Sequence, residues 1–224
     1  MANFCYNLKM KYSAVIFDWD GTLGMTLHIW LEAYKSELKN LGIELSDQTI
    51  IEDFFYEHKK TATKYPNIDF DPYIEKVRKY MISHAPLMKL YSGVNETLEK
   101  LQTRGIVLAL VSSSPRKLLE EVLELTGLSK FFSAISGFDD IMKHKPDPEP
   151  FLYIMEIAKL DPKTTIILGD SPHDIIAAKA AGIDSCLFLP PENKIFYDFD
   201  QLKKTNPNYS IETLEEFLEL ILNS

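Results

Sequence analysis

The sequence predicts an α/β fold in which a Rossmann-like, doubly wound parallel sheet forms a core with a small inserted α-helical domain. From residue 91 onward, short apolar runs typical of strands buried on both faces alternate with amphipathic helical patterns. One further run of this kind lies near the N-terminus, and the interval after it has helical periodicity but no convincing strand. Several of the runs end in polar residues, and parallel sheets bind ligands beyond the carboxyl ends of their strands.

The first strand is predicted over Ala14–Phe17, and two aspartates and a glycine follow it. Residues two apart on an extended chain point the same way, so we expect Asp18 and Asp20 on one side. Two carboxylates about 4 Å apart repel each other by roughly 4 kcal/mol at an effective dielectric constant near 20. A positive group is therefore expected beside them. An ordinary Asp-Gly turn at the end of a strand is the alternative interpretation.

The interval after the first strand is predicted to be a helical insertion. Its apolar spacing indicates helices over residues 29–41, 47–57 and 71–83, whereas the basic and hydroxyl-rich residues 58–66 are interpreted as a solvated link. Arg78 shares its helix with Lys76 and Lys79, so it is assigned to a solvated face. The expected domains are a discontinuous core (10–23 and 91–224), an inserted α-helical domain (24–90) and an N-terminal extension (1–9).

The remainder of the core is predicted to alternate strands with helices. Strands are expected over residues 106–111, 134–136, 165–168 and 185–189. Helices are expected over residues 92–104, 116–126, 149–159, 174–181 and 214–221, and glycines follow several of them. Residues 190–209 are polar and rich in turn formers, and no element is assigned to them.

The composition is that of an ordinary soluble globular protein. The 224 residues are 46% hydrophobic and 25% charged, with a formal net charge of −9. This acidity argues against nucleic acid or an anionic membrane as the main partner. No apolar run approaches the roughly 18 residues that span a membrane, and residues 1–9 lack the pattern of a signal peptide. Cys5 and Cys186 have no metal-ligand spacing, so two free thiols and a cytoplasmic location are expected.

Polar residues follow three later strands or precede helices in the predicted core. Ser112 and Ser113 follow a strand and could bind an anion at a helix start, although a simple N-cap is the alternative. Lys145 precedes a proline-rich helix entry, where a surface lysine is the plainer interpretation. Asp170 and Asp174 flank a strand-to-helix junction, and capping would explain only Asp174.

Taken together, the order Asp-x-Asp-Gly-Thr-Leu, strand-Ser, Lys-Pro and strand-Gly-Asp-x-x-x-Asp resembles the four motifs of the haloacid dehalogenase superfamily. The longer string from Asp170 to Gly182 is similar to the branch that contains phosphoglycolate phosphatases and β-phosphoglucomutases. The resemblance covers residues 12–24 and 92–189. It implies that the helical insertion is the cap of that branch, and that the core carries the chemistry.

The resemblance also implies a role for each motif residue. Asp18 would be the nucleophile that forms an aspartyl-phosphate, and Asp20 the general acid and base. Mg²⁺, which prefers oxygen ligands, would be the cofactor. The implied metal ligands are Asp18, Asp20 through its backbone carbonyl, Asp170 and, from farther out or through water, Asp174. The implied phosphate-binding residues are Ser112, Ser113 and Lys145.

Substrate contacts beyond the phosphate are expected from residues outside the motif aspartates. The candidates are Arg116, Lys59, Lys60 and His173, with a solvated loop as the alternative for the two lysines. Lys143 competes with Lys145 as the motif lysine, but only Lys145 precedes a proline. Where the branch commonly has Asp-Ser or Asp-Thr after the first motif, this chain has Met25-Thr26, which bears on the cap hinge and the substrate.

The function predicted from the sequence is that of a Mg²⁺-dependent phosphatase acting on a small phosphorylated metabolite through an aspartyl-phosphate. A phosphosugar mutase similar to β-phosphoglucomutase is a second possibility. A catalytically silent regulator that binds a phosphorylated ligand is a third, although a pure binder does not need both Asp18 and Asp20. A monomer or weak dimer is expected. The scarcity of arginine in the cap favours hydrolysis, since arginine is best suited to clamp a second phosphate.

Overall fold

The computed structural model describes residues 10–55 and 58–224 of the chain. The N-terminal extension predicted over residues 1–9 therefore lies outside the described residues. Among those that are described, no helix combines the length and apolarity that a membrane crossing needs.

The described residues form one six-stranded parallel sheet with the strand order β3-β2-β1-β4-β5-β6. The strands are β1 (Ala14–Phe17), β2 (Val107–Val111), β3 (Ala134–Ser136), β4 (Thr165–Gly169), β5 (Asp184–Phe188) and β6 (Tyr209–Ile211). β1 lies between β2 and β4, with Phe17 opposite Leu110 on one side and Leu168 on the other. The carboxyl ends of these three strands therefore meet at one edge of the sheet. The predicted parallel, doubly wound sheet is confirmed.

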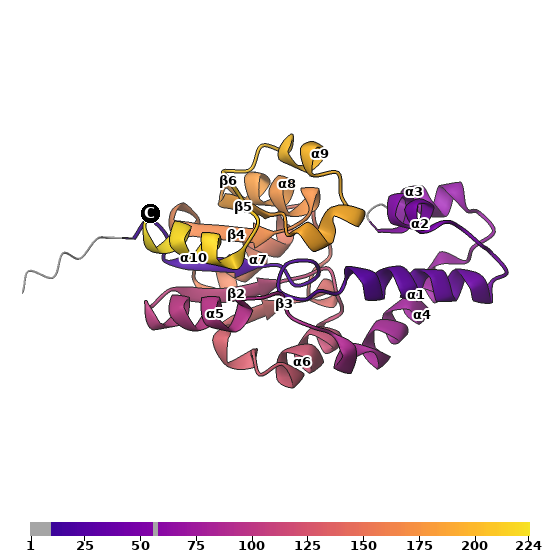
Figure 1. Ribbon diagram of the computed structural model, residues 1–224, viewed down its shortest axis with the longest axis horizontal. Helices are drawn as coiled ribbons and strands as arrows, with labels where there is room; N and C mark the ends of the chain where they lie inside the picture. Colours follow the sequence, from indigo (N-terminus) through magenta and orange to yellow (C-terminus); the bar gives the residue numbers. More distant parts are fainter. Residues whose placement is uncertain (1–9, 56–57) are drawn as a thin grey trace, which may run out of the picture.

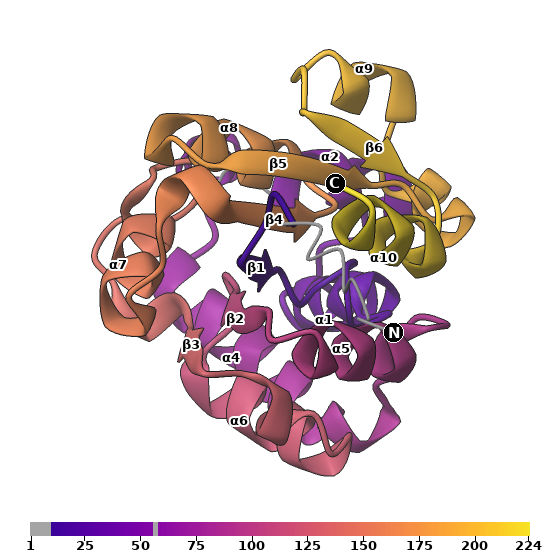
Figure 2. The same cartoon turned by 90° about the vertical axis from the view of Figure 1, so that its left-hand side faces the viewer.

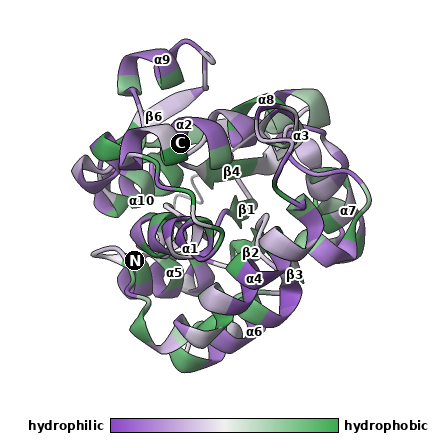
Figure 3. Ribbon diagram, turned by 90° about the vertical axis from the view of Figure 1, so that its right-hand side faces the viewer, coloured by the Kyte–Doolittle hydropathy of each residue, from purple (hydrophilic) through white to green (hydrophobic). Residues whose placement is uncertain are grey.

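Helices cover both faces of the sheet, as the two-residue period of buried strands requires. Val15 and Phe17 point into a core that includes residues of α5 (Val94–Thr103), α6 (Arg116–Leu125) and α10 (Leu214–Leu222). Ile16 points the other way, against α7 (Glu149–Ala158) and α8 (Pro172–Ala181). Figure 2 shows α7 and α8 on one side of the sheet and α5 and α10 on the other. Several helices carry both hydrophilic and hydrophobic stretches, as helices with one buried face do (Figure 3).

Between β1 and β2 the chain forms a unit of four helices, which we call the helical insertion. They are α1 (Leu27–Asn40), α2 (Asp47–Phe54), α3 (His58–Lys64) and α4 (Phe70–Ser83). The unit lies at the opposite end of the molecule from α5 and α10 (Figure 1). Tyr34, Phe54 and Tyr73 pack in its interior with ring centroids 5.9 to 6.4 Å apart. The prediction of a solvated link over residues 58–66 is wrong, because most of that segment is helix α3.

The two crossings between the sheet and the helical insertion lie side by side. Gly24 pairs with Leu90 in an isolated antiparallel bridge, and the Tyr91 amide donates to the Leu23 carbonyl. These contacts hold the start and the return of the helical insertion next to each other. A short 3₁₀ helix, η1 (Ala85–Leu87), precedes the return crossing.

The segment that the sequence left unassigned, residues 190–209, contains three short elements. They are η5 (Pro191–Ile195), α9 (Phe199–Lys203) and the start of the edge strand β6. Phe196, just after η5, packs against Phe55 and His28 of the helical insertion, with ring centroids 5.6 and 4.9 Å away. The segment therefore connects the sheet to the insertion. The remaining short 3₁₀ helices are η2 (Ser129–Phe131), η3 (Phe138–Asp140) and η4 (Pro162–Thr164).

Candidate active site

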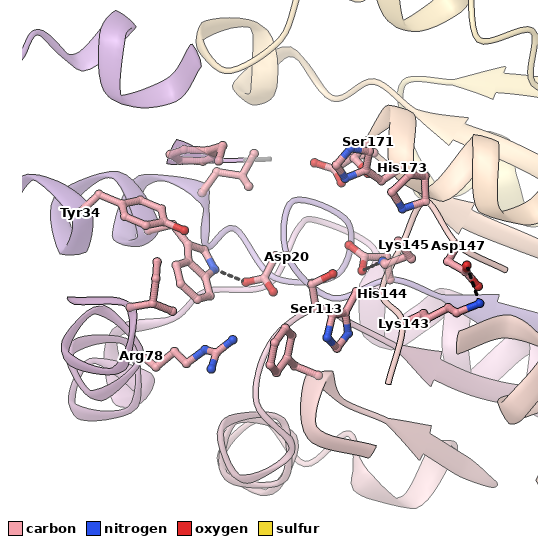
Figure 4. Close-up of a pocket in the computed structure, with 18 of the residues that line it drawn as sticks. Asp20, Tyr34, Arg78, Ser113, Lys143, His144, Lys145, Asp147, Ser171 and His173 are labelled. Atoms are coloured by element: carbon pink, nitrogen blue, oxygen red, sulfur yellow. Dashed lines mark hydrogen bonds and ion pairs between the residues drawn. The ribbon is translucent and has the colours of Figure 1, made fainter. Parts of the chain in front are cut away.

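A pocket of about 640 Å³ lies between the carboxyl edge of the sheet and the helical insertion. Asp18, Asp20, Ser113, Lys145 and Asp170 line it from the core side. Figure 4 shows Lys145 and His173 on one side, Tyr34 and Arg78 on the other, and Asp20 between them. The fold thus brings residues from all four sequence motifs to the wall of one cavity, and the second motif contributes Ser113.

Lys145 joins two buried carboxylates at the core of the site. Its Nζ donates to Asp18 Oδ1 at 2.6 Å and to Asp174 Oδ1 at 2.7 Å, and its side chain is only 5% exposed. Burial disfavours the charged lysine, but Asp174 and Asp18 outweigh it and raise the pKa of Lys145 above its ordinary value. The positive group expected beside Asp18 is therefore this lysine. Lys143 instead lies 3.6 Å from Asp147.

Asp170 and Asp174 are held by the junction between β4 and α8. Ser171 caps α8: its hydroxyl accepts from the Asp174 amide, and its own amide donates to Asp174 Oδ2 at 3.1 Å, which completes a capping box. The Ser171 hydroxyl also donates to Asp174 Oδ2 at 2.6 Å. A side chain at Gly21, whose φ is +76°, would place its Cβ 1.9 Å from Asp170 Oδ2. A side chain at Gly169 would place its Cβ 2.5 Å from Asp174 Cγ. Both glycines are needed for the carboxylates to approach the backbone this closely.

The carboxylates of Asp18, Asp170 and Asp174 could hold a divalent metal ion. All three are buried, and each offers an oxygen within 4.8 Å of the others. Burial, together with the charges of Asp174 and Asp20, raises the pKa of Asp18 to about 8 against the opposing effect of Lys145. Burial and the charges of Asp18 and Asp174 also raise the pKa of Asp170 well above its ordinary value. One lysine does not neutralise three buried carboxylates, so a cation with oxygen ligands fits here.

Asp20 does not join that cluster through its side chain. Among the described residues, four side chains donate to its carboxylate. Thr26 and Trp30, at the start of the helical insertion, donate to Oδ1 at 2.6 and 2.7 Å. Ser112 and Ser114, after β2, donate to Oδ2 at 3.2 and 2.7 Å. The Asp20 carboxylate is therefore fixed by both the core and the insertion.

The two predicted phosphate-binding serines have different surroundings. The buried Ser112 hydroxyl accepts from the Ser114 amide at 3.0 Å while it donates to Asp20. Ser113 is exposed and lines the pocket. In this structure Ser112 thus organises the turn after β2, and Ser113 faces the cavity.

Of the predicted substrate contacts, His173 lines the pocket, from the first turn of α8. Arg116 does not line it, because its guanidinium pairs with Glu120 at 2.8 Å and Asp140 at 3.1 Å. Lys60 is exposed on α3 and is not part of the pocket wall. The side chain of Lys59 lies outside the described part of the chain.

Arg78 lines the pocket, so its assignment to a solvated face is wrong. Its side chain is half-buried, and Cζ lies 3.9 Å from the ring centroid of Phe138. The period of α4 turns Arg78 away from the exposed Lys76 and Lys79 and towards the core. The helical insertion therefore does present an arginine to the pocket, and the scarcity of arginine there does not favour hydrolysis over a mutase.

Comparison with known proteins identifies the family. The sequence model of the haloacid dehalogenase-like hydrolase family matches residues 15–188. The chain belongs to this family. The match includes both aspartates after β1, the turn after β2, Lys145 and the junction between β4 and α8. The resemblance seen in the four motifs is thereby confirmed.

Curated relatives of this hydrolase include proteins named as phosphatases. Pyrophosphatase PpaX of Oceanobacillus iheyensis is 30% identical over 216 residues, which cover 96% of this chain and 99% of the relative. A plasmid-encoded phosphoglycolate phosphatase of Cupriavidus necator is 32% identical over 189 residues, which cover 80% of this chain and 82% of the relative. Among solved structures, a haloacid dehalogenase family hydrolase from Deinococcus radiodurans with bound phosphate and sodium has a TM-score of 0.77. At 21% identity and 96% coverage of both chains, that last likeness supports the fold.

Several residues that line this hydrolase's pocket or contact its motif residues were not predicted from the sequence. Trp30 carries no local signal apart from lying one helical turn after Thr26. Asn193 lies in a segment without periodicity, yet it is 2% exposed and donates to Asp170 Oδ2 at 3.2 Å and to the Gly21 carbonyl at 2.9 Å. Such contacts depend on how distant segments pack, and no spacing within the chain reveals them.

Proposed function

We propose that this hydrolase is a Mg²⁺-dependent phosphatase that cleaves a small phosphorylated metabolite through an aspartyl-phosphate on Asp18. The observation that carries the proposal is the pairing of a buried Asp18 with Lys145, next to two more buried carboxylates at the floor of a pocket. A carboxylate nucleophile, a fixed cation and a metal site are what phosphoryl transfer through an acyl phosphate needs.

The relatives support phosphorylated compounds as the substrate class. One is named for pyrophosphate and another for phosphoglycolate, and this chain covers most of the length of both. The two substrates share a transferable phosphoryl group and differ in the leaving group. The common element is therefore the chemistry at the floor of the pocket, and the substrate differs where the helical insertion meets the core. We accordingly retain residues 24–90 as the proposed cap domain.

In the proposed reaction, one Asp18 oxygen attacks phosphorus while Lys145 offsets charge on the transferring group. Asp20 would protonate the leaving oxygen and later take a proton from the attacking water. Its four hydrogen bonds hold its carboxylate in one orientation for both steps. Ser113, at the pocket wall, and Ser112, behind it, are the proposed binding residues for the phosphate.

Asp18, Asp170 and Asp174 are the residues that we propose to hold Mg²⁺, together with the backbone carbonyl of Asp20. When bound, the ion would offset the negative charge that the nucleophile and the phosphoryl group bring together. Asp174 already accepts from Lys145 and Ser171, which suits a supporting position. Asp170 accepts from Asn193 at Oδ2, and a hydrogen bond with Tyr197 also favours its charged form, so a bound ion would share this carboxylate with both side chains.

A phosphosugar mutase is the second candidate, and Arg78 is the observation that favours it. A mutase must hold a second phosphate of its bisphosphate intermediate, and Arg78 is a half-buried cation on the far side of the pocket from Lys145 (Figure 4). Phosphate release with water as acceptor distinguishes the two candidates. A mutase would convert a hexose phosphate to its isomer with little free phosphate, and only with a bisphosphate activator.

The test is a screen of phosphomonoesters and pyrophosphate for released inorganic phosphate, with Mg²⁺ and with a chelator. The proposal predicts steady release from at least one compound with Mg²⁺, loss of release in chelator, and poor support by Ca²⁺, whose coordination is longer and looser. Undiminished release in chelator would reject the metal-dependent scheme. No release from any compound, with binding of phosphorylated ligands retained, would favour the silent regulator.

A further inference from the structure

Aromatic side chains and one arginine form much of the wall of the pocket, beside the carboxylates proposed to bind a metal. Trp30, Tyr34 and Phe55 from the helical insertion and Phe138 and Tyr197 from the core line it. Arg78 enters the same wall from α4. A cavity of about 640 Å³ is in the range that holds a drug-sized organic molecule. Compounds as small as pyrophosphate and phosphoglycolate would fill only part of it.

Arg78 is held in place but has no carboxylate partner among the described residues. Its guanidinium lies over Phe138, and His144 stacks on the same ring with centroids 3.9 Å apart and an angle of 15° between the planes. Burial lowers the pKa of Arg78, and burial followed by the charge of Arg78 lowers the pKa of His144. An arginine stays ionised when partly buried, and a charge taken from water without a partner is costly.

The acidic side chain that contributes to the electrostatics of Arg78, Asp139, is already engaged. Its Oδ1 accepts from the Arg116 amide at 2.7 Å. It forms no ion pair with Arg78. Arg78 lines the pocket, and Figure 4 shows its side chain reaching from α4 into the space between Tyr34 and Ser113. An anionic group of a bound molecule would supply the missing partner.

We propose that the substrate is an organic phosphomonoester whose leaving group has an aromatic body and a second anionic group, and that Arg78 binds this second group. The aromatic body lies against the rings of the pocket wall, and the phosphoryl group lies at Asp18 and Lys145. This inference rests on the proposed phosphatase function and goes beyond it, because neither relative's named substrate has an aromatic ring. Arg78 is here a residue that determines specificity and takes no part in the chemical step.

The test compares phenyl phosphate with 3- and 4-carboxyphenyl phosphate, and adds phosphoglycolate and pyrophosphate as small references. Wild type is predicted to have a higher kcat/KM for at least one carboxylated ester than for phenyl phosphate. Arg78→Met should lower that ratio by about 10- to 100-fold, the effect of losing a charge-assisted hydrogen bond. Comparing this ratio of kcat/KM values between wild type and variant cancels the difference in intrinsic reactivity between the esters. Arg78→Lys should restore part of the preference.

Lys76→Met is the matched control, since it removes the same charge from an exposed position of α4. It should leave the ratio unchanged. Thermal unfolding curves identify any variant that fails to fold, and Arg78→Gln then replaces Arg78→Met. If the enzyme releases phosphate from phenyl phosphate but shows no preference for carboxylated esters that depends on Arg78, the inference is overturned. The proposed phosphatase function would then still hold. Higher kcat/KM for pyrophosphate or phosphoglycolate than for every aryl ester also overturns it. No release from any compound rejects the phosphatase function, and the inference with it.

Discussion

Asp20 accepts hydrogen bonds from two segments that are far apart in the sequence. Ser112 and Ser114 belong to the core, whereas Thr26 and Trp30 open the helical insertion. A proposed acid–base residue whose orientation depends on the insertion is sensitive to how the insertion sits on the core. The indole of Trp30, at 2.7 Å, is the contact that can be removed with the least change in shape.

Trp30→Phe should therefore lower kcat by about tenfold on an alkyl phosphate, the effect of losing one hydrogen bond to a charged group. The loss should be smaller on p-nitrophenyl phosphate, because p-nitrophenolate leaves readily without a proton. Steady-state rates on both substrates provide the measurement. An equal loss on both would mean that Trp30 acts through packing alone.

The protonation of Asp18 should make both the stability of the fold and its increase on metal binding depend on pH. Burial raises its pKa to about 8 in the folded protein without metal, whereas an unfolded aspartate titrates near 3.9. Between these values the folded state binds more protons than the unfolded state, so this residue's contribution to stability falls as the pH rises towards 8. A metal ion needs the ionised carboxylate, so its stabilising effect should rise over the same window.

The melting temperature with and without Mg²⁺, at about pH 5.5 and about pH 8, measures this effect. The increase caused by Mg²⁺ should be larger at the higher pH, and Asp18→Asn should remove most of the difference. If Mg²⁺ raises the melting temperature of the wild type equally at both pH values, the assignment of Asp18 as a metal ligand is contradicted.

At the scale of elements, the short helix η5 connects three parts of the molecule through one side chain. Asn193 accepts from the Tyr91 hydroxyl at the return crossing, and donates to the Gly21 carbonyl and to Asp170. Asn193→Ala would remove the partner of the buried Tyr91 hydroxyl and of the Gly21 carbonyl, so we expect a loss of about 1–3 kcal/mol in the free energy of unfolding. Urea denaturation measures it. Asn67→Ala, at an exposed site, should stay within about 0.5 kcal/mol of wild type. Equal effects of the two substitutions would show that η5 is only loosely tied to the core.

The elements also show how far the sequence could be interpreted. β1, β2, β4 and β5 were predictable because strands buried on both faces form continuous apolar runs. α3 was missed because its residues, His-Lys-Lys-Thr-Ala-Thr-Lys, have no apolar face that marks a helix. β6 was missed because its three residues, Tyr-Ser-Ile, directly follow a polar segment rich in turn formers.

The candidate site divides in the same way. Asp18, Asp20, Lys145, Asp170 and Asp174 follow strands or open helices at fixed spacings, so local pattern and family resemblance point to them. Arg78, Trp30 and Asn193 reach the pocket or the motif residues only because the insertion and the segment after β5 fold over the carboxyl edge of the sheet. That arrangement depends on contacts between residues more than a hundred positions apart, such as those of Asn193 with Gly21 and Tyr91.

At the scale of the whole molecule, the proposed chemistry lies at the centre of the sheet, and the proposed selectivity lies at the junction with the helical insertion. β1 is flanked by β2 and β4, so the residues after these strands converge beside Asp18. The insertion starts and returns next to β1, at the bridge between Gly24 and Leu90, and contributes one wall of the pocket (Figures 1 and 4). A change of substrate then requires a change in that wall and leaves the floor intact.

The proposed mechanism depends most directly on Asp18 as the nucleophile, and the rate of phosphate release by the Asp18→Asn variant tests this role. With Mg²⁺ and the best substrate from the phosphomonoester screen, the rate of phosphate release should be lower in the variant by roughly 10³-fold or more. Circular dichroism should show an unchanged fold. Asp200→Asn, the same chemical change at an exposed position of α9, should keep the wild-type rate. Substantial turnover by a folded Asp18→Asn variant would contradict the nucleophilic role of Asp18, and with it the proposed mechanism.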